Sequence, residues 1–206
     1  MNDINVVFWG DSFVNRTGVK NSSCPEKRFS TNYIGNFPDM VCKKLFVHYP
    51  TIHFEFFNEG QSGDTSIDLI QRFYHIPKSK INILVLLVGY NDAKKMSIDK
   101  FKESYEQLID KIAEREYQTI AVSVLPSIDN EALNKKIKVV NSEIINVNKK
   151  AGNRYINVYE HFDRVIKYKI KIHLYEETKH LSELGNIYIA DQVFKEIENI
   201  LSEMYL

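Results

Sequence analysis

Three short polar motifs in this sequence each follow an apolar, strand-like run. They read GDS at residues 10–12, SGDT at 62–65 and GYND at 89–92. Because the carboxyl ends of parallel strands line the ligand crevice of an open α/β sheet, we expect the three motifs to surround one site. A serine there can act as a nucleophile if a base takes its proton and nearby donors stabilise the oxyanion of the tetrahedral intermediate. The arrangement therefore indicates acyl transfer at Ser12.

The sequence also offers the donors and the base that this chemistry needs. The backbone N–H groups of Ser12 and Gly63 are expected to point at the oxyanion, since glycine lets the substrate approach the chain closely. The Asn91 side-chain amide is a third, neutral donor. His180 lies in the segment YEETKHLSELGN, just before the last amphipathic pattern, where its imidazole can face the crevice as the base.

Other residues of these motifs are expected to support or line the site. Asp11 and Asp92 can accept hydrogen bonds from loop N–H groups and so hold Ser12 and Asn91 in position. Tyr90 is the better candidate for a substrate pocket, whereas the two aromatic residues that flank the nucleophile, Trp9 and Phe13, suit core packing equally well. The remaining histidines match no motif and are assigned surface or packing roles: His48, His53, His75, His161 and His173.

These motifs require a scaffold of alternating strands and helices. Apolar, β-rich runs occur at about 4–9, 52–57, 81–88, 118–125 and 154–159. The segments between them show helical periodicity, and the helix at about 97–115 has Ser97 and Asp99 as candidate caps. Five strands separated by helices predict a parallel sheet covered on both faces. The stretch 15–33, with its Asn, Ser, Pro and Gly residues, is interpreted as a long functional loop.

Composition favours a single domain over residues 1–206. The chain is 44% hydrophobic and 26% charged with formal net charge zero, so no overall charge draws it to nucleic acid or anionic lipid. The N-terminal apolar run is too short for a signal peptide or a membrane span, which predicts a cytoplasmic protein with no stable membrane association. Cys24 and Cys42 are then expected to be free thiols.

On these motifs the sequence resembles the SGNH hydrolases of the GDSL lipase/esterase family. GDS at 10–12 is similar to the family's nucleophile block, Gly63 to its oxyanion glycine, and GYND at 89–92 to its Gly-x-Asn-Asp block. HLS at 180–182 is similar to its catalytic histidine segment. The resemblance runs over residues 5–203 and implies a three-layer α/β/α fold with the flavodoxin-like strand order 2-1-3-4-5.

The sequence departs from this family at the acid of the triad. Where the family usually has an aspartate three residues before the histidine, this chain has Glu177, which is preceded by Glu176. Glu177 keeps the spacing and is the first choice to orient His180. Two alternatives stay open: Glu176 takes this role, or a backbone carbonyl orients the ring of a Ser-His dyad.

The activity indicated is that of a serine esterase acting through an acyl-enzyme. We expect it to remove a short acyl group, acetyl in the first instance, from a carbohydrate or another small alcohol. The sequence has no metal-ligand spacing and no phosphate-binding glycine loop, and the chemistry needs neither metal nor cofactor. An acyltransferase using the same serine, a lysophospholipase or arylesterase, and a noncatalytic carbohydrate-binding module are the alternatives.

Overall fold

The computed structural model describes residues 3–15, 35–73, 81–168, 174–175 and 180–205. In these residues five parallel strands form one sheet in the order β2-β1-β3-β4-β5, the order implied by the family resemblance. The strands are β1 (Asp3–Gly10), β2 (His53–Gly60), β3 (Ile81–Leu87), β4 (Gln118–Val122) and β5 (Arg154–Ile156). At the carboxyl end of the sheet, Gly10 of β1 lies beside Gly60 of β2 and Leu87 of β3.

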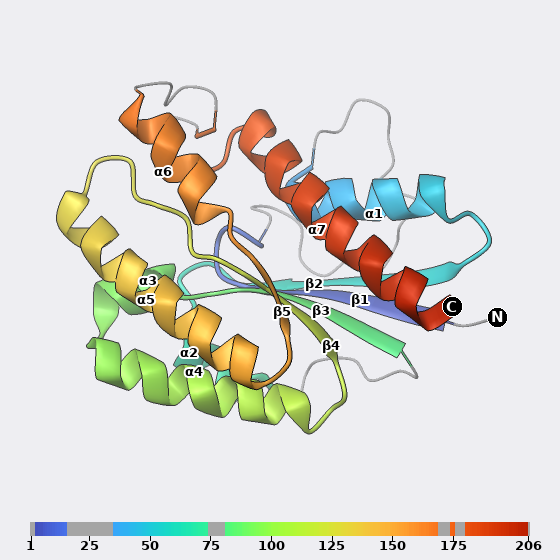
Figure 1. The fold of residues 1–206 in the computed structure, drawn as a ribbon, viewed down its shortest axis with the longest axis horizontal. Helices are drawn as coiled ribbons and strands as arrows, with labels where there is room; N and C mark the ends of the chain where they lie inside the picture. Colours follow the sequence, from blue (N-terminus) through green and yellow to red (C-terminus); the bar gives the residue numbers. More distant parts are fainter. Residues whose placement is uncertain (1–2, 16–34, 74–80, 169–173, 176–179, 206) are drawn as a thin grey trace.

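Helices cover both faces of the sheet, which gives the three layers expected (Figure 1). One face carries α1 (Phe37–His48), α6 (Tyr159–Lys167) and α7 (Glu183–Tyr205). The other face carries α2 (Ser66–Gln71), α3 (Tyr90–Lys95), α4 (Ile98–Ala113) and α5 (Glu131–Lys150). No helix within the described residues is long and apolar enough to cross a membrane.

Two hydrophobic cores, one on each face, hold the sheet between the helices. In β1, Ile4, Val6 and Phe8 pack toward α1 and α7, while Val7 and Trp9 pack toward the helices of the other face. This alternation follows from the two-residue period of a β-strand. All five side chains are almost completely buried. The strand that ends at the GDS motif is therefore fixed from both sides.

Local sequence explains where the helices near the site begin. Thr65 is the N-cap of α2 and forms a capping box with Asp68, because the Thr65 hydroxyl accepts from the Asp68 N–H and the Asp68 carboxylate accepts from the Thr65 N–H. Ser97 caps α4, as predicted, by accepting from the Lys100 N–H. Asp99, the second candidate cap, lies instead in the first turn of α4, where a carboxylate complements the helix dipole.

Two strands end earlier than the apolar pattern predicts. β4 ends at residue 122 rather than 125, and β5 ends at residue 156 rather than 159. Beyond these ends, side chains rather than a neighbouring strand bond the backbone groups. Ser123 Oγ accepts from the Tyr159 N–H. The Asn141 side chain accepts from the Val124 N–H and donates to the Val124 carbonyl. The apolar residues continue past the ladder because they are buried against helices rather than because they form a strand.

Candidate active site

The nucleophile motif forms a tight turn at the end of β1. There is no space for a side chain at Gly10, because an added Cβ would collide with the Leu87 carbonyl oxygen. Asp11 is completely buried, and its Oδ1 accepts from the Phe13 N–H at 3.0 Å. The Asp11 carbonyl accepts from the Asn15 N–H at 2.9 Å, which closes the turn. Ser12, at the centre of this turn, is half-buried.

The oxyanion candidate Gly63 has the backbone conformation that favours glycine. Its φ is +89°, and an added Cβ would meet no atom within 4 Å, so the peptide borders open space. Its carbonyl oxygen accepts from Lys95 Nζ of α3 at 2.7 Å. A substrate can thus approach the Gly63 backbone while Lys95 holds the other side of the residue.

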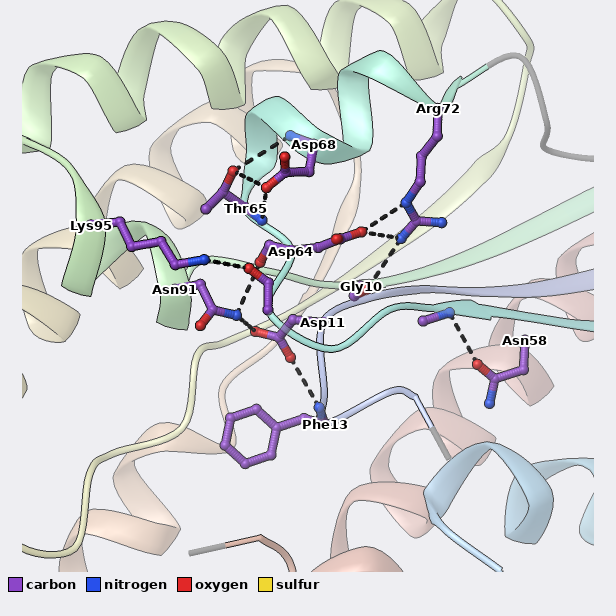
Figure 2. A network of polar contacts seen from close by, with 12 residues as sticks. Gly10, Asp11, Phe13, Asn58, Asp64, Thr65, Asp68, Arg72, Asn91 and Lys95 are labelled. Atoms are coloured by element: carbon purple, nitrogen blue, oxygen red, sulfur yellow. Dashed lines mark hydrogen bonds and ion pairs between the residues drawn. The ribbon is translucent and has the colours of Figure 1, made fainter. Parts of the chain in front are cut away.

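Asn91 joins the three motifs. Its Nδ2 donates to the Asp64 carbonyl oxygen at 3.0 Å and lies 3.4 Å from Asp11 Oδ2 (Figure 2). The second distance exceeds the usual range of an N–H···O bond, so this N–H is the more weakly held of the two. The loops after β1, β2 and β3 therefore lie together, as their placement at strand ends predicted.

Asp92 supports the site through the neighbouring loop. It is fully buried, and its Oδ1 accepts from both the N–H and the hydroxyl of Ser66, at 2.9 and 2.5 Å. The Ser66 hydroxyl is also within 2.6 Å of the Ser104 hydroxyl on α4. Asp92 thus fixes the first residue of α2, and so the segment that contains Gly63, while its predicted role in holding Asn91 in position stays a prediction.

An ion pair closes the network behind this loop. Arg72 Nε and Nη2 lie 2.7 and 2.6 Å from Asp64 Oδ2, and Nη2 lies 3.4 Å from the Gly10 carbonyl oxygen (Figure 2). The guanidinium lies over the Trp9 ring, with Cζ 5.8 Å from the ring centroid. Arg72 thereby connects the end of β1 with the residue that follows Gly63.

Three carboxyl groups lie behind the site, and burial shapes their protonation. The pKa of Asp11 is raised to about 7, mainly by burial and to a lesser degree by the nearby Asp92 and Asp64, while the hydrogen bond from the Phe13 N–H opposes the increase. Burial also raises the pKa of Asp92, although Ser66 opposes this change. The pKa of Asp64 is raised by burial as well, and the Arg72 guanidinium offsets part of the increase. Burial behind Ser12 thus raises the pKa of all three carboxyl groups, and Asp64 is the one that an ion pair compensates.

His180 lies beside the nucleophile turn, next to the aromatic ring of the residue after Ser12. The Phe13 and His180 ring centroids are 6.4 Å apart, and His180 is exposed. On its other side Phe13 meets Tyr90 edge-to-face, with 5.5 Å between ring centroids. Phe13 is buried and belongs to the core, while half-buried Tyr90 borders both cores, so the pocket role of Tyr90 remains a prediction.

Several predicted features lie outside the described residues. These are Glu176, Glu177, Cys24, His75, His173 and all of the 15–33 loop except residue 15. Of the other histidines, His48 and His53 are exposed and His161 stacks on Tyr188 with 4.0 Å between ring centroids, as surface or packing roles require. Cys42 is buried.

Sequence reasoning missed four polar residues of this network: Arg72, Lys95, Ser66 and Ser104. Arg72, Lys95 and Ser66 contact motif residues through their side chains from positions outside the motifs, and Ser104 contacts Ser66. Only the capping-box spacing of Thr65 and Asp68 gave a sequence signal for the local structure. No group of three or more His, Cys, Asp or Glu residues suited to a metal ion occurs in the described residues.

The arrangement of sheet, helices and carboxyl-end site defines a three-layer α/β/α protein of the hydrolase type. Axe2, an acetylxylan esterase from Geobacillus stearothermophilus, superimposes with a TM-score of 0.78 at 16% identity, over 94% of this chain and 93% of that one. LAE5, an alpha/beta hydrolase enzyme from the metagenome of Lake Arreo, gives 0.75 at 18% identity over 93% of both chains. Structures also exist for catalytic mutants of Axe2 in which a serine, an aspartate or a histidine is replaced.

The sequence profile of the GDSL-like Lipase/Acylhydrolase family matches residues 8–186, and the chain belongs to this family. It is accordingly a carboxylic ester hydrolase of the GDSL type. No curated protein sequence gives a significant match.

Proposed function

We propose that this protein is a serine esterase that removes a short acyl group, acetyl in the first instance, from a carbohydrate or another small alcohol. The observation that carries the proposal is the position of Asn91 Nδ2 between Asp11 and Asp64, which brings the nucleophile turn, the oxyanion glycine and the Gly-x-Asn-Asp motif into one site. The acetylxylan esterase Axe2, which shares the fold, supports the choice of acetyl and carbohydrate.

In the proposed reaction Ser12 Oγ attacks the ester carbonyl carbon while His180 takes its proton. The carbonyl oxygen becomes an oxyanion that accepts hydrogen bonds from the N–H groups of Ser12 and Gly63 and from Asn91 Nδ2. Collapse of the intermediate breaks the bond to the alcohol, which leaves with the proton from His180. Water then attacks the acyl-enzyme with His180 again as base, releasing the acid and restoring Ser12.

The acid that orients His180 is proposed to be Glu177. In Axe2 the aspartate and the histidine of the catalytic mutants are three residues apart, the spacing between Glu177 and His180 here. Glu177→Gln should then remove most of kcat while Glu176→Gln does little. The reverse result would assign the role to Glu176, and full activity in the double Gln variant would exclude a triad built on either glutamate.

The proposed function is tested with a fluorophosphonate probe and a panel of esters. Wild type should be labelled on Ser12 and should hydrolyse p-nitrophenyl acetate and acetylated sugars, whereas Ser12→Ala should keep the fold and lose both properties. Labelling at another residue would contradict the assignment. Running the panel with and without added sugar acceptor separates hydrolysis from acyl transfer, and longer p-nitrophenyl esters separate a short-chain esterase from a lysophospholipase.

A further inference from the structure

The segment that carries the oxyanion glycine is held largely by side chains from other elements. Lys95 bonds the Gly63 carbonyl, Asn91 bonds the Asp64 carbonyl, and Asp92 accepts from the Ser66 N–H. These three residues all come from α3, the helix after β3. They fix the segment relative to β3. At β1, which carries Ser12, the Gln61 N–H donates to the Gly10 carbonyl at 3.0 Å, and a second connection, made by a side chain, reaches the same carbonyl.

Arg72 makes that second connection. Its guanidinium pairs with Asp64, the residue after Gly63, and reaches the carbonyl of Gly10, two residues before Ser12. These contacts span 8 and 62 residues of sequence. The Arg72 and Asp64 side chains are 20% and 7% exposed, so solvent screens the pair only partly. Arg72 therefore joins the loop after β1 to the loop after β2. These loops carry two of the three proposed oxyanion donors, the backbone N–H groups of Ser12 and Gly63.

We propose that Arg72 is a positioning residue for catalysis, which sets the distance between the Ser12 and Gly63 backbone N–H groups by tying Asp64 to the carboxyl end of β1. This inference rests on the proposed esterase function. Arg72 touches neither substrate nor nucleophile in this role. Its effect belongs to the transition state, because donors that are displaced by a fraction of an ångström stabilise the developing oxyanion less well than they bind the neutral ester.

The Arg72 guanidinium also compensates the charge of the Asp64 carboxylate. Without Arg72, the nearly buried Asp64 carboxylate would lie unpaired near Asp11, and an uncompensated buried charge destabilises a fold strongly. In a variant that lacks only Arg72, a change in kcat would therefore combine the loss of positioning with the effect of the unpaired charge. Removing the Asp64 charge at the same time separates them, so the double variant is part of the test.

The experiment compares Arg72→Met, Arg72→Lys, Asp64→Asn and the double variant Asp64→Asn/Arg72→Met with wild type. Thermal unfolding, kcat and KM for p-nitrophenyl acetate, and the rate of fluorophosphonate labelling are measured for each. Arg72→Met should lower kcat roughly 10–100-fold with KM changed less than about threefold, by the cost of displacing reacting groups by about 1 Å. Labelling should slow in parallel, because the probe's phosphonyl oxygen uses the same donors.

The other variants identify the route of the effect. Arg72→Lys keeps the charge but cannot reach Asp64 and Gly10 in one planar fork, so its kcat should lie between those of wild type and Arg72→Met. If Arg72 acts through Asp64, the double variant should be more stable than Arg72→Met yet no more active. Should Arg72→Met fail to fold, the double variant and Arg72→Lys supply the same comparison of kcat with KM.

Arg115 provides a matched control. Its guanidinium lies over Phe73, with Cζ 5.0 Å from the ring centroid, and Phe73 packs against Trp9, the ring under Arg72. Arg115 thus shares the aromatic cluster of Arg72, whereas the contacts with Asp64 and Gly10 described above belong to Arg72. Arg115→Met should therefore leave kcat at the wild-type value. A wild-type kcat in a folded Arg72→Met variant would overturn this inference, and so would equal losses of kcat in Arg72→Met and Arg115→Met. Either result would leave the proposed esterase function in place. A wild type that neither hydrolyses esters nor reacts with the probe would overturn the proposed function and this inference with it.

Discussion

At the scale of single residues, the site is a set of donors held in place by buried carboxyl groups. Asp11 fixes the turn around Ser12, and Asp92 fixes the segment that carries Gly63. Asn91 lies between them and has one N–H that is well bonded and one that is weakly held. The weakly held N–H, which faces Asp11, is the one that an oxyanion can take without breaking the shorter bond from Asn91 to the Asp64 carbonyl.

Replacing Asn91 tests this reading directly. Asn91→Ala should lower kcat roughly 10²–10³-fold with a smaller change in KM, because the lost donor acts on the charge that develops in the transition state. Steady-state kinetics with p-nitrophenyl acetate would measure it. Asn148→Ala is a matched control, since that buried amide bonds Tyr105 and the Ile144 carbonyl near the C-terminal end of α5. It should cost stability and spare kcat; unchanged kcat in Asn91→Ala would place its amide outside the oxyanion hole.

The raised pKa of Asp11 predicts a pH dependence of stability. The unfolded carboxyl titrates near its ordinary value of 3.8 and the folded one near a pKa of about 7, so the native state holds a proton that the unfolded chain releases. The free energy of unfolding should therefore receive a contribution from Asp11 that is full below about pH 4 and is lost as the pH rises through 7.

Urea unfolding across this pH window would measure the contribution. Asp11→Asn keeps a neutral side chain of nearly the same shape and cannot titrate, so its stability should fall less steeply with pH than that of wild type. The difference between the two curves isolates Asp11 from the other carboxyl groups that titrate in the same window. Parallel curves for the two proteins would show that Asp11 is ionised in the fold throughout.

At the scale of elements, the connection from β4 to α5 shows how side chains extend a sheet. Asn141 bonds the N–H and the carbonyl of Val124, and Asn134, two turns earlier on α5, does the same for Ser127. Each asparagine thus replaces one residue of a neighbouring strand. Val124 in turn packs where a side chain at Gly89, the first residue of the motif that contains Asn91, would lie.

Asn141 and Asn134 allow a matched test of how much these side-chain bonds to the backbone stabilise the fold. Asn141→Ala leaves two buried backbone groups of Val124 without their partner and should lower the free energy of unfolding by about 2–6 kcal/mol, at about 1–3 kcal/mol for each group. Asn134→Ala should cost less, because its contacts with Ser127 are only partly buried. Urea unfolding of both variants checks the order; equal losses would show that burial does not set the cost.

Much of this element structure could be predicted from sequence, because it depends on local pattern. The run at 81–88 is buried on both faces and forms β3, and Ser97 caps α4 as its position indicates. The ends of β4 and β5 were placed wrongly because apolar residues continue beyond the ladder. Arg72 could not be assigned at all, since its contact with Gly10 joins residues 62 apart and has no local signature.

At the scale of the whole molecule, the two halves of the proposed machinery come from different layers. Of the proposed oxyanion residues, Gly63 precedes α2 and Asn91 lies in α3, whereas His180 precedes α7. The helices α2 and α3 cover one face of the sheet, and α7 covers the other (Figure 1). The histidine segment must therefore be held by long-range contacts. Tyr175, paired with Leu181 in an isolated bridge, donates its hydroxyl to the Pro126 carbonyl at 2.8 Å.

Asn186 is the second anchor and joins elements 149 residues apart. Its Oδ1 accepts from the N–H of Phe37, the first residue of α1, at 2.9 Å. Its Nδ2 donates to the carbonyls of Leu181 and Ser182, the two residues after His180, at 3.2 and 2.9 Å. One buried amide therefore ties the histidine segment to α1 and α7, two of the three helices on its face.

This geometry predicts that Asn186 affects activity as well as stability. Asn186→Ala should lower the free energy of unfolding by about 1–3 kcal/mol, since the buried Phe37 N–H loses its acceptor. It should also lower kcat about tenfold or more, because His180 loses the restraint on the residues that follow it and base positioning depends on sub-ångström geometry. Thermal unfolding and steady-state kinetics, run well below the melting temperature, would separate the two effects.

Asn199 on the same helix is the control, because its amide contacts only the exposed region near Glu196 at 3.4 Å. Asn199→Ala should change neither quantity. Asn141→Ala adds a second comparison: it removes a buried amide of similar connectivity on the opposite face, so any loss of kcat from general destabilisation would appear there too. A folded Asn186→Ala enzyme with the kcat of wild type would contradict the prediction, because His180 would then be positioned without the contacts of Asn186.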